Sequence, residues 1–446
     1  MSAITPSAPS TADEVESALA YNFAVHTVDA AFFGLAIGLA SWITVIPLFL
    51  ASQTDSALAI GMIASIQPLG WHLPQLLTAK RVARLPRLMP MVMRMTIIER
   101  VPFFVLAALA LAAGRLSASA VIGSTYLLVA LIGLGGGLTA TPFQSLVGKI
   151  VPMRRHGLFY GIKTASANLL LALGAVAAGR ILDARPGNIG FAICFALAGL
   201  ATVLSWLALS RTREPGSADG LEPRTALLAS PGRIPAGPGA LPPPPADAMA
   251  APDALPRAGA ILRRDTAFRR FLIARTLAQV TTMAAAYYTL FAIRRFGASG
   301  ELLGWMTAVF ALAQVLGNPL LGWAGDRWGH VSAMRLGLLA GSLGAGAAIL
   351  APNAGWLFVA YFLTGLANVA AFTLPLSMNL RFGSPTERPI YIGLSSTLTA
   401  PSIVLAPLLG GWLVERYGFG AAFLLALIGG LGASASLQRG MGQPPA

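Results

Sequence analysis

Long apolar segments separated by short polar ones dominate the chain. Twelve segments have about the length that a bilayer requires of a helix, roughly 20 residues at a rise of 1.5 Å. Because few charged residues interrupt them, each predicts a membrane-spanning helix. The first six cover residues 22–50, 57–79, 94–113, 119–147, 158–182 and 188–210, and the second six cover 268–293, 301–323, 332–350, 355–380, 390–414 and 418–437.

Three segments depart from this pattern and set the domain boundaries. Residues 1–21 carry Pro, Ser and acids without a signal-like apolar stretch, and they predict a disordered cytoplasmic tail. Residues 211–267 are rich in Pro, Gly and Ala, which predicts a flexible cytoplasmic linker. Residues 438–446 form a second tail. The expected fold is therefore all-α, with a six-helix bundle over 22–210 and another over 268–437.

Composition supports a membrane environment for these helices. Only 11% of the residues are charged and the mean hydropathy is +0.70, whereas a soluble domain carries about a quarter charged residues. The single cysteine, Cys194, excludes an internal disulfide framework and a multi-cysteine metal site. We expect no cofactor and no bound metal.

The formal net charge of +14 indicates topology rather than nucleic-acid binding, because no basic, aromatic-interleaved soluble domain is present to bind nucleic acid. If the N-terminus is cytoplasmic, 25 of the 31 Lys and Arg residues fall on the cytoplasmic side. This bias predicts both termini inside a plasma membrane, and we expect a bacterial inner membrane.

The two halves of the chain resemble each other. At an offset of 232 residues, Gly157–Asp183 lies over Pro389–Glu415 without a gap, and Ala178-Gly179 matches Gly410-Gly411. Upstream of this run, at a larger offset, Gly70-Trp71 matches Gly322-Trp323. Two similar halves joined by a linker are typical of transporters in which one half rocks against the other around a central site.

A loop between the eighth and ninth predicted helices carries a family resemblance. Residues Gly322–His330 read Gly-Trp-Ala-Gly-Asp-Arg-Trp-Gly-His, which is similar to the G-x-x-x-D-R-x-G-[RK] loop of the major facilitator superfamily. Arg155 and Arg388 resemble basic loop elements of the same family. The loop at Gly70 in the first half lacks the expected Asp, and helix 5 lacks the Gly-Pro-x-x-Gly-Gly arrangement of drug–proton antiporters.

This resemblance implies alternating access, with a cavity lined mainly by helices 1, 4, 7 and 10. It also implies a cytoplasmic gate, in which Asp326 lies near the positive N-terminal end of helix 11 or pairs with Arg381 or Arg388. The residues of this expected gate motif are Gly322, Asp326, Arg327, Gly329 and Arg388.

Ionisable residues inside the predicted helices are the main candidates for transport chemistry, because burying a charge in a membrane costs a few kcal/mol. Asp29 and Arg275 lie at similar depths in helices 1 and 7, where they pair with each other, bind a charged substrate or hold a coupling proton. Glu99 in helix 3 is a second acidic candidate. Lys163 is interpreted as reaching the interface, and His26 as structural or as a proton relay.

Neutral polar residues complete the set of candidates. They either bond between helices or orient a substrate. Tyr287 and Tyr288 offer aromatic walls on helix 7, of which only one faces inward. The neutral candidates are Gln144, Gln279, Gln314, Asn318, Asn368 and Asn379.

Other classes of protein fit the sequence less well. It contains no H-E-x-x-H motif and no phosphate-binding loop, which argues against a metalloprotease and an ATP-driven pump. We therefore predict a secondary transporter of a small molecule, working as a monomer, with H⁺ coupling favoured by the acids. Na⁺ coupling, uncoupled permeation and a receptor or assembly factor on a transporter fold stay open, as does the direction of transport.

Overall fold

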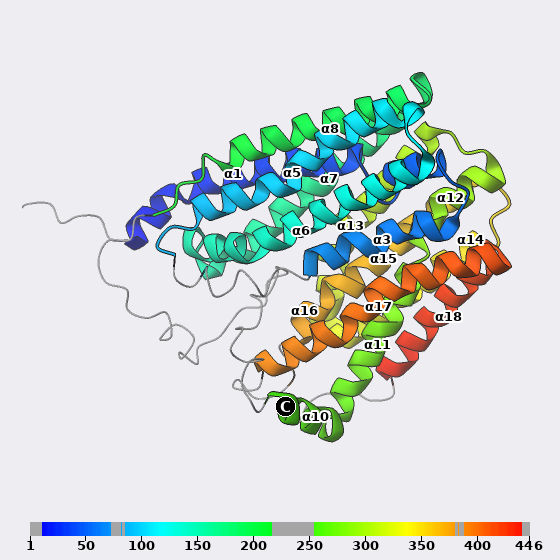
Figure 1. Cartoon of the computed structure of the whole chain (residues 1–446). Coiled ribbons are helices and arrows are strands. Elements are labelled where there is room, and N and C mark those ends of the chain that lie inside the picture. Colours follow the sequence, from blue (N-terminus) through cyan, green and yellow to red (C-terminus); the bar gives the residue numbers. More distant parts are fainter. Residues whose placement is uncertain are drawn as a thin grey trace, which may run out of the picture.

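The computed structural model describes residues 11–72, 82, 85–215, 254–379, 382 and 388–438. Every regular element within these ranges is a helix (Figure 1). The first half contains α1 (Thr11–Leu39), α2 (Val45–Ala51), α3 (Ala57–His72), α5 (Met89–Ala112), α6 (Ala118–Ile150), α7 (His156–Ala184) and α8 (Asn188–Leu209). The second half contains α10 (Ala254–Arg264), α11 (Thr266–Thr282), α12 (Ala285–Phe296), α13 (Gly300–Trp328), α14 (His330–Ile349), α15 (Leu357–Phe372), α16 (Leu374–Asn379), α17 (Arg388–Tyr417) and α18 (Phe419–Gln438).

The helices are those of a multi-pass membrane protein. In the described part of the chain, ten are long and apolar enough to cross a membrane. The predicted segments 57–79 and 268–293 correspond to shorter helices, α3 with 16 residues and α11 with 17, the latter followed by α12. The all-α fold is thus confirmed, while a count of twelve spans stays a prediction for these two segments.

Three of the predicted segments, 22–50, 268–293 and 355–380, form broken rather than continuous helices. Segment 22–50 stops at Leu39 and resumes at Val45, and in the gap the Ser41 hydroxyl accepts the backbone N–H groups of Ile43 and Thr44. Such local side-chain bonds compete with helix continuation. Segment 355–380 breaks at Thr373, two residues before Pro375, whose ring disfavours a continuous helix.

The helices form two bundles, with α1, α3, α5, α6, α7 and α8 in one and α11 to α18 in the other (Figure 1). The linker end of the molecule is the end where α8 finishes and α11 begins. The joined end is the opposite one, where α7 packs on α13 and α3 packs on α17. The bundles lie together at the joined end and diverge toward the linker end (Figure 1).

Two predicted boundaries are wrong. The first helix begins at Thr11, so residues 11–21 belong to α1 and not to a disordered tail. The predicted linker is structured at both of its ends. Beyond α8, the Glu214 carboxylate accepts the backbone N–H groups of Leu88 and Met89 at 2.9 and 3.0 Å. Before α11, residues Ala254–Arg264 form α10, whose high proportion of small and basic residues permits a short amphipathic helix.

Candidate functional site

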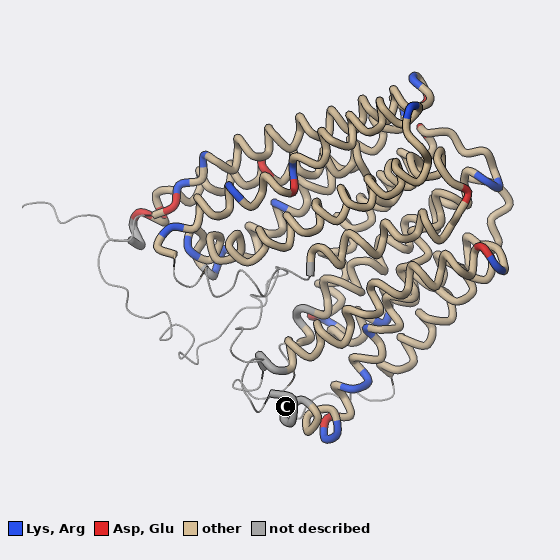
Figure 2. Tube along the Cα trace, in the orientation of Figure 1, with Lys and Arg blue, Asp and Glu red and all other residues tan. Residues whose placement is uncertain are grey.

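Four charged side chains meet inside the N-terminal bundle, and we call them the N-bundle charge cluster: Asp29, Glu99, Arg100 and Lys163. They come from α1, α5 and α7, and the first three are only 6–7% exposed. Figure 2 shows acidic and basic residues close together part-way along this bundle, whereas most other charges lie near helix ends. Two acids and two bases in a buried site balance one another, as buried charges require.

Asp29 has several partners in this cluster. Its Oδ1 atom accepts a 2.7 Å hydrogen bond from the Ser205 hydroxyl and lies 3.8 Å from Arg100 Nη2. Its Oδ2 atom lies 3.9 Å from Lys163 Nζ. Asp29 thus contacts a hydroxyl donor and two cations, more charged and polar partners than Glu99 has among the described ion pairs.

Arg100 links the two acids and is well satisfied. Its Nε and Nη1 atoms donate to the backbone carbonyls of Thr202 and Thr96 at 3.1 and 3.2 Å. Its Nη2 atom donates to Ser205 Oγ at 3.0 Å. The guanidinium fork is thus held in one orientation between α5 and α8, as its planar geometry favours.

Glu99 is held more loosely than Asp29. Its only ion-pair contact among the described residues is with Arg100 Nη1, at 3.9 Å. Space for its carboxylate exists because α6 carries a glycine opposite it, and a Cβ atom on Gly136 would lie 3.0 Å from Glu99 Oε1. A buried carboxyl with one distant counter-charge is the member of the cluster best suited to bind and release a proton.

Lys163 and His26 border the cluster within a group of aromatic side chains. The Lys163 ammonium lies 3.8 Å from the centre of the Phe143 ring, and its side chain is 20% exposed. The expectation that Lys163 reaches the interface is wrong, because it turns inward to Asp29. His26 is fully buried against Phe143 and Phe159, and its Nδ1 atom has no partner.

The C-terminal bundle has a much smaller polar group, formed by Arg275 and Gln279 of α11 with Ser395 of α17. Arg275 Nη1 donates to the Ser395 hydroxyl, while Arg275 Nε has no partner in the described part of the chain. Gln279, one helical turn further on, is 4% exposed, and the described residues offer no partner to its Nε2 atom either. Of the three roles left open for Asp29 and Arg275, pairing with each other does not occur in this conformation, because each residue contacts partners in its own bundle.

The neutral candidates do not gather at one place. Asn318 bonds within α13, donating to the Gln314 carbonyl at 2.8 Å, which is a helix-internal role. Gln144 on α6 has a buried Oε1 atom without a partner, as has the Oδ1 atom of Asn379. Asn368 is partly buried on α15. His72, whose side chain lies outside the described residues, cannot be placed among them.

Both helix-7 tyrosines are fully buried, and their rings have different surroundings. Tyr288 contacts the Thr364 hydroxyl within its own bundle, at 3.2 Å. Tyr287 donates to the Pro407 carbonyl and packs where α3 and α17 meet, so it belongs to the contact between the bundles. The two rings occupy adjacent positions of α12, which point about 100° apart around a helix, so their surroundings differ.

Sequence reasoning missed the residues that hold the two bundles together. At the joined end, the Asp183 carboxylate accepts the backbone N–H groups of Gly300 and Glu301 at 2.7 and 2.8 Å. Ser299 caps the same helix by accepting the N–H of Leu302 at 3.2 Å. An acid from the end of α7 thus satisfies N-terminal donors of α13 that have no partner within that helix.

The other bundle repeats this arrangement. Glu415, near the end of α17, accepts the Leu58 N–H at 3.0 Å and the Ser56 hydroxyl at the start of α3. Ser56 Oγ also accepts the Ala59 N–H at 3.1 Å, as Ser299 does for α13. We call these two contacts the Asp183 latch and the Glu415 latch. The sequence repeat already paired Asp183 with Glu415, and this was the signal for them.

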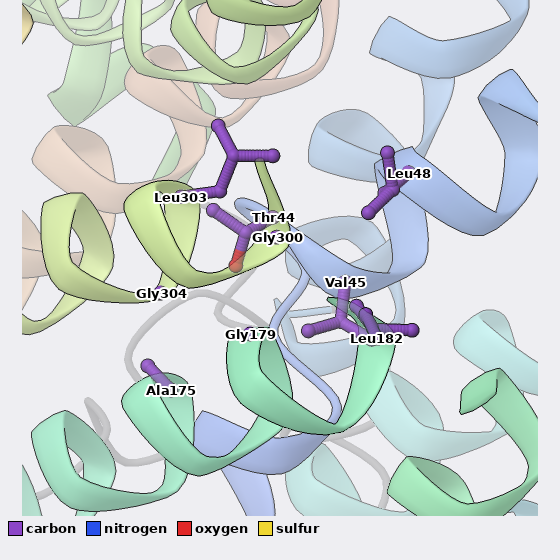
Figure 3. A pocket seen from close by; sticks show the side chains of 9 residues that line it. All are labelled: Thr44, Val45, Leu48, Ala175, Gly179, Leu182, Gly300, Leu303 and Gly304. Atoms are coloured by element: carbon purple, nitrogen blue, oxygen red, sulfur yellow. The ribbon is translucent and has the colours of Figure 1, made fainter. Parts of the chain in front are cut away.

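Glycines four residues before each latch allow the helices to touch. A Cβ atom on Gly411 would lie 2.7 Å from the Cα of Leu58, and one on Gly179 would lie 2.8 Å from the carbonyl carbon of Gly300. A small hollow remains where α7 meets α13 (Figure 3). Its lining is aliphatic or small and uncharged, so it gives a solute no charged group. The lining residues are Thr44, Val45, Leu48, Ala175, Gly179, Leu182, Gly300, Leu303 and Gly304.

The expected gate motif lies at the linker end, in the last turn of α13. Gly329 ends this helix with a φ of +87°, a conformation that favours glycine. Gly322 has open space where a Cβ would be. Asp326 and Arg327 are exposed, and the described residues include no ion-pair or hydrogen-bond partner for either side chain. Arg381 and the side chain of Arg388 lie outside the described residues.

Comparison with known proteins agrees with this architecture. Residues 271–438 match the sequence model of the Major Facilitator Superfamily. The solved structure of a D-xylose–proton symporter superposes with a TM-score of 0.65, at 14% identity, covering 94% of this chain and 96% of that one. The C-terminal half of the chain is thus similar in sequence to the Major Facilitator Superfamily, and the whole chain has the fold of that symporter. A bacterial homologue of the iron transporter ferroportin, in an inward-facing state, has a similar fold, with a TM-score of 0.64, at 11% identity over 94% of this chain and 98% of that one.

Curated proteins that are similar in sequence match shorter stretches of this chain. The multidrug resistance protein B homolog of Mycobacterium tuberculosis is 28% identical over 154 residues, which is 34% of this chain and 28% of the relative. Multidrug resistance protein 1 of Bacillus subtilis is 29% identical over 134 residues, 28% of this chain and 34% of the relative. The chain thus matches only about a third of the length of these relatives, which leaves its own substrate open.

Proposed function

We propose that this protein is a secondary transporter that moves a small solute across a membrane by alternating access. The observation that carries the proposal is the way the bundles are joined. Two acid-to-helix latches, related by the internal repeat, hold one end together, while the bundles diverge at the other end. Contacts of this kind are exposed and involve few atoms, so they are able to break and re-form during transport.

The linker end faces the cytoplasm of a bacterial cell in this proposal, with both termini inside. Support comes from the basic residues, which concentrate at that end in the sequence. The structure then represents an inward-facing conformation, closed on the outer side by the Asp183 and Glu415 latches. A monomer is sufficient, because both halves of the transport unit lie in one chain.

Proton coupling takes place at the N-bundle charge cluster in this proposal. With both acids ionised the cluster carries no net charge, and protonating one acid leaves it at +1. Glu99 is the acid that takes the proton, because Asp29 has two cations and the Ser205 hydroxyl while Glu99 has one ion-pair contact at 3.9 Å. Loss of the Glu99 charge weakens the ion pair between Glu99 and Arg100. Asp29 is then the one charged acid of the cluster beside the Arg100 guanidinium.

The test is solute accumulation by the purified protein in liposomes under an imposed pH gradient. Pools of metabolites and toxic compounds are offered, and uptake is followed by mass spectrometry. We expect gradient-dependent accumulation by the wild type and its loss in Glu99→Gln. Glu16→Gln is the matched control, because it makes the same chemical change on an acid that is exposed on α1.

Each of the other outcomes points to a different function. Accumulation that ignores the pH gradient in both wild type and Glu99→Gln contradicts proton coupling and favours Na⁺ coupling or uncoupled permeation. Absence of flux with folded protein and every pool contradicts transport itself and favours a receptor or an assembly factor. Loss of flux in Asp29→Asn but not in Glu99→Gln would move the proton to Asp29.

A further inference from the structure

The internal repeat relates an ion pair in the N-terminal bundle to a cation in the C-terminal bundle that has no anionic partner among the described residues. In the N-terminal bundle α1 packs on α7, and Asp29 faces Lys163 at 3.9 Å. In the C-terminal bundle the equivalent helices are α11 and α17, where Arg275 donates to the Ser395 hydroxyl. Lys163 and Ser395 are matched by the 232-residue offset. The C-terminal bundle therefore has a cation and a hydroxyl where the N-terminal bundle has a cation and an anion.

Arg275 has no anionic partner in the described part of the chain. No carboxylate of the described residues lies within 4 Å of it, and its Nε–H group is unpaired among these residues. Asp265, the acid nearest to it on the same helix, accepts the Phe268 N–H at 2.8 Å and the Tyr391 hydroxyl at 3.0 Å. Ten residues of helix separate Asp265 from Arg275, about 15 Å, so Asp265 does not compensate the guanidinium.

The two polar side chains associated with Arg275 each carry a group that can donate a hydrogen bond. Gln279 is 4% exposed, and its Nε2 amide group has no acceptor among the described residues. The Ser395 hydroxyl is fully buried. Leaving buried N–H groups unpaired is costly, and a guanidinium beside an amide and a hydroxyl is a donor set that matches the oxygens of a carboxylate or a phosphate. Arg275 itself is partly exposed, so a ligand has access to it.

We propose that Arg275, Gln279 and Ser395 bind the anionic group of the transported solute, a carboxylate or a phosphate. This inference rests on the proposed transport function and adds the substrate class to it. The bound oxyanion supplies Arg275 with an opposite charge, which in the repeat-related pair Asp29 and Lys163 supply to each other. Arg275 supplies the charge, and Gln279 and Ser395 orient the oxygens. Arginine suits this role because its planar fork matches both oxyanions.

The first test is anion-dependent thermal stability of the purified protein in detergent, which needs no flux. The probes are benzoate and phenyl phosphate, with benzamide as the uncharged control. We expect one or both anions to raise the melting temperature of the wild type and to bind Arg275→Gln about tenfold more weakly or worse. Arg269→Gln is the matched variant, because Arg269 is exposed on the same helix and its bonds among the described residues are to Leu262 and Thr266.

The pattern of shifts decides the proposal. Stabilisation by benzoate alone assigns a carboxylate, and stabilisation by phenyl phosphate alone assigns a phosphate. Equal stabilisation of Arg275→Gln, or equal effects of benzamide and benzoate, would overturn it. So would the absence of any shift in the wild type. None of these results bears on whether the protein transports, which the liposome experiment answers separately.

A second variant tests the missing charge without any ligand. Ser395→Asp places a carboxylate opposite Arg275, so we expect its melting temperature to exceed that of Ser395→Asn, which has nearly the same size and no charge. We also expect benzoate to give Ser395→Asp no further stabilisation, because the site is filled. Equal melting temperatures for the two variants would show that Arg275 lacks no anion, and would contradict the assignment.

Discussion

Acidic side chains at the two ends of the molecule differ in whether they are hydrogen-bonded to the start of a helix. At the joined end, Asp183 and Glu415 bind the N-terminal N–H groups of α13 and α3. At the linker end, Asp326 is the acid expected to approach a helix N-terminus, and it is exposed without a partner among the described residues. An engaged pair at one end and a free acid at the other are what one conformation of an alternating-access protein requires.

The latches are weak enough to reverse. Asp183 and Glu415 are exposed, so solvent screens their charges. A side chain that caps a helix N-terminus contributes about 1 kcal/mol. The two latches together then bias the molecule toward closure of the joined end by about 2 kcal/mol, roughly thirtyfold in population. A change of protonation or of bound solute is large enough to overcome this bias.

The largest effect is expected from a bulky residue at the glycine contact of the joined end. Gly411→Val places side-chain atoms against the Leu58 backbone and prevents α17 from approaching α3. Overpacking of this kind costs about 1–3 kcal/mol, so we expect transport to fall about tenfold or more, as measured by liposome flux. Gly123→Val is the control, because a Cβ on Gly123 meets no atom. Equal loss in both variants would argue against a specific contact.

A smaller effect is expected when both latches are removed. Asp183→Ala with Glu415→Ala removes both acceptors of the helix N–H groups, so the roughly thirtyfold bias toward closure is largely lost. We expect greater access of a thiol reagent to a cysteine placed at Leu48, which lines the hollow between the bundles. Glu301→Gln, which affects only the exposed pair with Arg180, should leave access unchanged. Unchanged access in the double variant would contradict a latch role.

The smallest effect is expected at the linker end. Asp326→Asn removes an acid that has no partner among the described residues and that, in the proposed gate, binds a helix end when the linker end closes. An exposed charge of this kind is worth less than about 1 kcal/mol, so we expect transport slowed about threefold with solute binding unchanged. Initial rates and equilibrium binding on the same preparation measure both quantities. Transport at the wild-type rate would remove Asp326 from the gate.

Much of the fold follows directly from the sequence, because helix length and apolar content are local properties. The predicted segment 119–147 lies within α6, and segment 188–210 coincides with α8 to within one residue. The helix breaks were less predictable. The stop at Leu39 depends on bonds made by the Ser41 side chain, and α1 extends back to Thr11 through residues that are polar enough to resemble a tail.

The site was only partly predictable, since a charged residue does not reveal its partner. Asp29 and Glu99 were recognised as candidates because a carboxyl group in an apolar helix is costly. Their partners Arg100 and Lys163 lie on α5 and α7, and only the packing of these helices shows that Asp29 pairs with them and not with Arg275. The latch acids were visible as matched positions in the repeat, but their role needed the facing helix ends.

The central claim, that the two ends open and close in alternation, is tested most directly by distances between spin labels in the reconstituted protein. Cys194 is fully buried, so labels attach to introduced cysteines. One pair, Ser210→Cys with Gln438→Cys, reports on the linker end, and the pair Ser119→Cys with Asn353→Cys reports on the joined end. If the two ends alternate, removing both latches shortens the linker-end distance and lengthens the joined-end distance. Distances that stay fixed, or that change in the same direction at both ends, would contradict it.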